Sequence, residues 1–216
     1  MLLLAISFAA VAVACAVWYW FGVRHSRRRA GEVARWLESA LAGQGHVTGI
    51  RWISSCRFQL PLRLAQGMFR RASVVVEMTP CDLPFQWALA KIKPRPEVLT
   101  FQADLDLPPV FSLHVQNFRW FARSSRRQPK NSGWAFERTA PVLISTRSQW
   151  QKEVSCAMSS LAQGSSHDFL TIDFQRRSPH FRVTLPLEAI APGSPTRTCV
   201  FESMRELASN SSASLY

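Results

Sequence analysis

The chain has 216 residues, of which 26 are lysine or arginine and 14 are aspartate or glutamate, so its formal net charge is +12. A hydrophobic content of 47% excludes global disorder, and the length suffices for one domain with a buried core. The positive charge favours anionic partners, namely phospholipid head groups, nucleic acid or acidic proteins.

The first segment is a long apolar run. Leu2 to Val23 contains neither a charged residue nor a proline. As a helix it would reach about 33 Å, which exceeds the roughly 30 Å of a bilayer core. Trp18, Tyr19 and Trp20 stand near its end, where aromatic rings prefer the membrane interface. No basic residue precedes the run, and it is longer than the apolar part of a cleaved signal peptide. We therefore predict that residues 1–23 form a single transmembrane anchor of the bacterial signal-anchor type.

A basic juxtamembrane segment, residues 24–30, follows the anchor. It contains Arg24, Arg27, Arg28 and Arg29. By the positive-inside rule, these membrane-flanking arginines predict an N-terminus outside and a domain in the cytoplasm, at the inner membrane. The five cysteines include no CxxC pair, which is consistent with a reducing compartment.

Three further helices are expected. Residues 31–42 carry apolar side chains at helical spacing, with no proline to separate them from the anchor. Residues 83–92 form a short apolar stretch that prolines terminate. Ser148 and Gln151 make a capping box for a helix over residues 148–162.

The rest of the domain has the pattern of β-strands. Short runs rich in β-branched and aromatic residues are separated by turn residues and prolines, without a repeating βα unit. We predict an α+β fold: one globular domain, residues 31–208, with a mainly antiparallel sheet of about six to eight strands and two or three helices packed on one face. Residues 209–216 are predicted to be a disordered tail. The expected strands are 47–53, 57–64, 73–78, 97–107, 111–116, 169–175 and 180–185, and residues 133–144 are expected to form one or two more, interrupted at Pro141.

Residues 97–107 show the clearest alternation of apolar and polar side chains, and residues 111–116 resume it after two prolines. Matching their apolar faces predicts a hairpin in which Asp104 faces His114, with Asp106 on the same side. Such a polar group is a speculative site for base catalysis or for half of a metal centre. The alternative interpretation is a cross-strand ion pair at the surface.

A second candidate surface is the segment 118–130, in which three aromatic residues alternate with basic ones. This composition fits contact with an anionic lipid surface or with single-stranded nucleic acid, and it also fits a solvated loop. The possible lipid or anion contacts are Arg119, Arg123, Arg126, Arg127 and Lys130.

The sequence contains no Walker loop, GxGxxG, GxSxG, HExxH or EF-hand pattern. We therefore assign no catalytic, cofactor-binding or metal-binding residue and expect no cofactor. The leading hypothesis is a non-enzymatic binding or assembly module at the inner membrane surface, with anionic phospholipid or an acidic protein as partner. The alternatives are a membrane-bound enzyme, with a site near the polar group described above, and a membrane-tethered nucleic-acid-binding domain.

Overall fold

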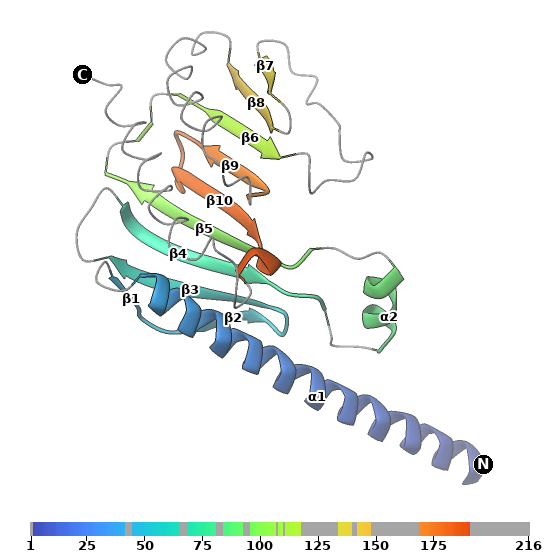
Figure 1. Cartoon of the computed structure of the whole chain (residues 1–216). Coiled ribbons are helices and arrows are strands. Elements are labelled where there is room, and N and C mark those ends of the chain that lie inside the picture. Colours follow the sequence, from blue (N-terminus) through green and yellow to red (C-terminus); the bar gives the residue numbers. More distant parts are fainter. Residues whose placement is uncertain are drawn as a thin grey trace.

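The computed structural model describes residues 2–41, 45–64, 69–80, 84–92, 96–106, 108–109, 111–117, 134–139, 142–147 and 169–190. This part of the chain consists of one long N-terminal helix, an antiparallel sheet and a short second helix that stands apart from the sheet (Figure 1). The α+β class predicted from the sequence is confirmed.

Helix α1 (Leu2–Ala40) is a single helix of 39 residues, about 58 Å long. It runs without interruption through the predicted anchor, the basic segment and the start of the predicted domain. Its N-terminal half is exposed and apolar: Phe8 is 80% exposed and Val11 is 64% exposed. By length and composition it is the one helix in the described residues that is able to cross a membrane.

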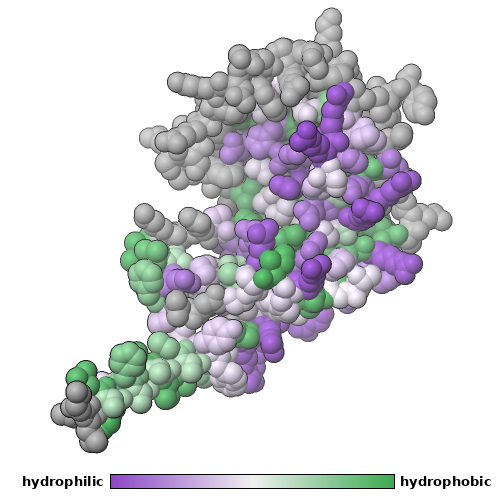
Figure 2. Space-filling model, turned by 180° about the vertical axis from the view of Figure 1, so that it is seen from behind, coloured by the Kyte–Doolittle hydropathy of each residue, from purple (hydrophilic) through white to green (hydrophobic). Residues whose placement is uncertain are grey.

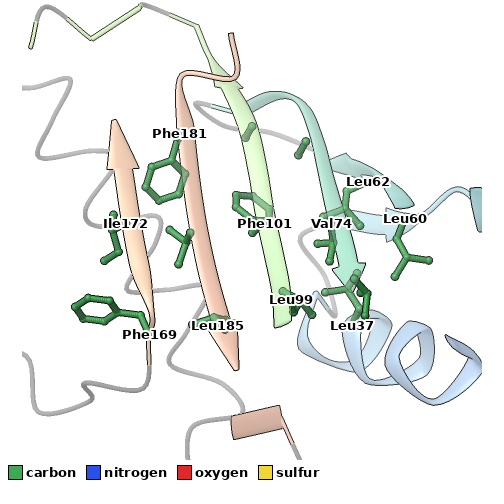
Figure 3. Close-up of a cluster of buried hydrophobic side chains, with 14 of the residues drawn as sticks. Leu37, Leu60, Leu62, Val74, Leu99, Phe101, Phe169, Ile172, Phe181 and Leu185 are labelled. Atoms are coloured by element: carbon green, nitrogen blue, oxygen red, sulfur yellow. The ribbon is translucent and has the colours of Figure 1, made fainter. Parts of the chain in front are cut away.

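The C-terminal half of α1 belongs to the core of the domain. Val33, Trp36 and Leu37 are buried, at helical spacing on one face. Leu37 is fully buried and belongs to the core cluster that also contains Leu60, Val74 and Leu99 (Figure 3). The helix therefore joins the exposed apolar segment to the folded domain without a flexible linker.

The sheet contains ten strands in the part of the chain that the structure describes, and every described pairing is antiparallel. The spatial order is β1-β3-β4-β5-β10-β9-β6-β8-β7, and β2 pairs with β3 beside β1. The sequence predicted about six to eight strands. Residues 47–53 were expected to form one strand, but they include the end of β1 and most of β2, and residues 133–144, expected to form one or two strands, contain β7 and the start of β8. The strands are β1 (Gly45–Val47), β2 (Arg51–Ser54), β3 (Arg57–Leu64), β4 (Phe69–Glu77), β5 (Val98–Leu105), β6 (Leu113–Asn117), β7 (Trp134–Thr139), β8 (Val142–Arg147), β9 (Thr171–Phe174) and β10 (Phe181–Pro186), and a short 3-10 helix, η3 (Leu187–Ile190), follows β10.

One face of the sheet is apolar and buried. Along β5, buried and half-buried residues alternate over the whole strand, as the sequence predicted. Phenylalanines dominate the centre of this face, where Phe101, Phe174 and Phe181 form a chain of ring contacts with centroids 4.8 to 6.1 Å apart. The opposite face carries polar side chains, and hydrophilic groups cover much of the molecule when it is seen from behind (Figure 2).

The predicted hairpin between residues 97–107 and 111–116 is wrong. Strand β5 pairs with β4 and β10, whereas β6 pairs with β8 and β9. Two strands, β10 and β9, therefore lie between β5 and β6. The expected strands 169–175 and 180–185 are present as β9 and β10, and the two strands pair with each other.

Two local features shape the sheet near its first edge. A side chain on Gly45 would place its Cβ 2.6 Å from the backbone oxygen of Arg63, so β1 approaches β3 closely at a position where only glycine fits. In β4, the pairing with β5 shifts register between Arg70 and Ser73, and Arg71 has a φ of 40°. This bulge turns both Arg70 and Arg71 outward into solvent.

Helix α2 (Pro84–Ile92) forms where the sequence predicted it, but it does not pack on a face of the sheet. It stands beyond the ends of β4 and β5, on the side toward the N-terminal half of α1 (Figure 1). The prediction that the helices pack together on one face is thus correct for the second half of α1 and wrong for α2. The predicted helix over 148–162 and the tail 209–216 lie outside the described residues.

Candidate functional site

Three of the four predicted membrane-flanking arginines share one surface. Arg24, Arg27 and Arg28 are exposed and occupy positions i, i+3 and i+4 of α1, so they lie on the same side of the helix. We call these three residues the arginine collar. Together with Tyr19, Trp20 and Val23 they line an open hollow of about 570 Å³.

Aromatic and cationic groups meet directly in this hollow. The guanidinium carbon of Arg24 lies 5.3 Å from the ring centre of Trp20, within the range of a cation–π contact. Arg29, the fourth predicted residue, instead lies 3.7 Å from Glu32 on the next turn of the helix. The collar therefore presents concentrated positive charge one turn after an aromatic belt, an arrangement that suits phosphate groups above an apolar layer.

The open face of the sheet carries a second polar feature, which crosses several strands. The side-chain amides of Gln59 and Gln102 each donate a hydrogen bond of 3.1 Å to the hydroxyl of Ser73. In the next strands along the sheet, Arg182 pairs in register with Gln102 on one side and with Asp173 on the other. We call this line of polar residues, which continues to His114, the polar row.

His114 and Asp173 form the one histidine–carboxylate pair of the polar row. They face each other across β6 and β9, and Nδ1 of His114 bonds to Oδ1 of Asp173. The hydrogen bond and the charge of Asp173 raise the pKa of His114 above its usual 6.5, against the opposing effect of burial. Because the His114 side chain is 38% exposed, the pair is partly screened by solvent.

The structure does not bring together the predicted polar group of Asp104, Asp106 and His114. Asp104 accepts a hydrogen bond of 2.7 Å from the hydroxyl of Ser178, and Asp106 forms an exposed ion pair with Arg70. The reason is the strand order, since β10 and β9 separate β5 from β6. His114 takes its carboxylate partner from β9, a residue that the sequence analysis did not single out.

The segment 118–130, with Arg119, Arg123, Arg126, Arg127 and Lys130, lies outside the described residues. Within the described residues, no group of three or more histidine, cysteine, aspartate or glutamate side chains is arranged to hold a metal ion.

A second cavity, of about 400 Å³, lies between α2 and the neighbouring ends of β4 and β5. Most of its lining is apolar, and one side is formed by Leu89 and Ala90 of α2. It contains none of the residues of the polar row.

Comparisons with known proteins do not indicate a function for this chain. No protein-family model matches the chain, and no curated protein matches it. The crystal structure of the mycobacterial trehalose monomycolate transport factor A, TtfA, is similar to 73% of this chain over 70% of its own length, with 8% sequence identity and a TM-score of 0.38. At this level of similarity, the function has to be argued from the residues of this chain alone.

Proposed function

We propose that the chain is a single-pass membrane protein whose domain is a non-enzymatic binding module for anionic phospholipid at the inner membrane surface. The main observation behind the proposal is that α1 has an exposed apolar N-terminal half and a C-terminal half whose apolar face is buried in the domain. An apolar helix surface of this length is stable in lipid and unfavourable in water.

The arginine collar supports the choice of ligand. It begins at Arg24, directly after the last apolar residue of the span, so it would stand at the level of the head groups. Each arginine near an anionic surface contributes about 1 kcal/mol. The ring of Trp20 beneath Arg24 is typical of a side chain at the same boundary.

The orientation follows from the same residues. The arginines on the domain side of the apolar segment favour a cytoplasmic domain. We expect a fluorescent reporter at the C-terminus to be active and an alkaline phosphatase reporter at the same position to be inactive. The opposite result would place the domain outside the cytoplasm and contradict the assignment to the inner leaflet.

Lipid binding is tested by removing two collar charges. We expect the full chain carrying Arg27→Gln and Arg28→Gln to bind anionic phospholipid about 2 kcal/mol more weakly, roughly 30-fold, as measured by titration of the detergent-purified protein with phosphatidylglycerol. The matched control is the double variant Arg63→Gln and Arg182→Gln, which removes the same charge from exposed or half-buried strand positions. Equal losses in the two variants would show that binding depends on net charge alone.

A further inference from the structure

Helix α2 has a surface that a water-exposed helix does not normally have. Phe85 is 70% exposed, Leu89 is 49% exposed and Ile92 is 75% exposed. With Ala88, which is also exposed, these residues follow the spacing i, i+3, i+4 and i+7, so they form one continuous apolar face. A face of this kind normally packs against a core, but α2 stands beyond the ends of the strands, and a cavity lies between it and the sheet.

A ring contact fixes the position of α2 along the apolar half of α1. Trp87 of α2 meets Trp18 of α1 edge to face, with ring centres 5.6 Å apart. Trp18 precedes Arg24 by six residues, which corresponds to about 9 Å along the helix axis on the membrane side of the arginine collar. Helices that lie in the membrane interface bury their apolar face about 5–10 Å deep, so α2 stands at the depth of such a helix.

The charge around α2 agrees with this position. Its sequence, PFQWALAKI, contains a single charged residue, Lys91, and Lys93 and Arg95 follow directly in the sequence. Short apolar helices with basic neighbours are typical of segments that lie in anionic membrane surfaces. Seen from behind, the hydrophobic surfaces of α1 and α2 lie at the same end of the molecule (Figure 2).

We propose that α2 inserts into the same leaflet in which α1 emerges, so that the domain is attached to the bilayer at two points. This proposal rests on the proposed membrane span of α1. The occupant of the apolar face is lipid rather than a second protein, because the contact between Trp87 and Trp18 holds α2 beside the part of α1 that is proposed to lie in lipid, with the apolar face exposed. A two-point attachment would hold the sheet in one orientation to the membrane and keep the cavity behind α2 next to the acyl chains.

The test places an environment-sensitive fluorophore at three exposed sites of the full chain, one site at a time. The five native cysteines are first replaced, and the labelled variants are Leu89→Cys in α2, Val11→Cys in α1 and Arg63→Cys in β3. Because all three side chains are exposed, labelling leaves the core intact. The proteins are reconstituted into vesicles that contain phosphatidylglycerol, with nitroxide-labelled lipids as quenchers at two depths.

We expect the probe at Leu89 to emit at shorter wavelength than the probe at Arg63 and to be quenched most strongly by the shallow nitroxide. The probe at Val11 should be quenched most strongly by the deep one. If Val11 is quenched and Leu89 behaves like Arg63, the second attachment is refuted and the span remains. If Val11 is not quenched, the span itself fails, and the inference fails with it. A blue-shifted but unquenched probe at Leu89 would mean that the probe lies in the cavity between α2 and the sheet or under another protein, and either result overturns the proposal.

Discussion

The His114–Asp173 pair illustrates what single residues contribute to this sheet. Both side chains belong to the face opposite the buried phenylalanines, and their strands are direct neighbours. The described part of the chain places no serine, cysteine or threonine side chain in hydrogen-bonding distance of the imidazole; the nearby Ser145 hydroxyl donates to the backbone oxygen of His114 instead. The geometry of the pair is that of an ion pair between directly neighbouring strands.

An ion pair that includes a histidine makes the stability of the fold depend on pH. The pKa of His114 is raised in the folded state, so the pair stabilises the fold fully below the unfolded value of 6.5 and loses this effect as pH rises through the folded pKa. We expect Asp173→Asn to lower the free energy of unfolding by up to about 1 kcal/mol near pH 6 and by much less near pH 8.5. Urea unfolding of the full chain in detergent at the two pH values measures the difference.

The control for this measurement is Asp106→Asn. Asp106 pairs with an arginine, Arg70, whose charge does not change in this pH range, so its effect should be small and equal at both pH values. A loss in Asp173→Asn that is equally large at both pH values would show that the charge of His114 does not contribute.

At the scale of elements, the sequence pattern predicts single helices and strands better than it predicts which strands pair with each other. The alternation in β5 and the spacing in the second half of α1 each follow from contacts with a single buried layer, so both could be predicted from the sequence. The partner of β5 could not be predicted in the same way. Matching of apolar faces is satisfied equally well by β6 and by β10, because alternation states which side chains share a face and not which strands are neighbours.

The candidate sites differ in the same way, because some consist of residues close in the sequence and others join residues that are far apart. The arginine collar consists of residues that are close in the sequence, so a local pattern is enough to group them. The His114–Asp173 pair joins residues 59 positions apart, and no local signal links them. The exposed face of α2 was also beyond prediction, because an apolar run of nine residues has the same composition in a core as at a membrane surface.

At the scale of the whole molecule, α1 is one continuous helix that, in the proposed arrangement, connects the bilayer to the sheet as a rigid rod. The same helix carries the exposed Val11 and the fully buried Leu37, and no linker separates them. If α1 spans the membrane as proposed, the number of residues between the span and the core therefore sets the height and rotation of the domain above the membrane. The depth of α2 depends on that number as well.

An insertion into α1 tests this coupling. Seven residues of a strong helix former, placed between His25 and Ser26, add almost two full turns and raise the domain by about 10 Å with little rotation. We expect the probe at Leu89 to change to the emission of a water-exposed site, because α2 leaves the lipid, while the probe at Val11 is unaffected. Seven glycine and serine residues at the same place should leave Leu89 in the lipid, since a flexible joint lets the domain return to the surface. If the rigid insertion also leaves Leu89 immersed, α2 would hold the domain at the membrane independently of α1, and the rigid connection would not set its depth.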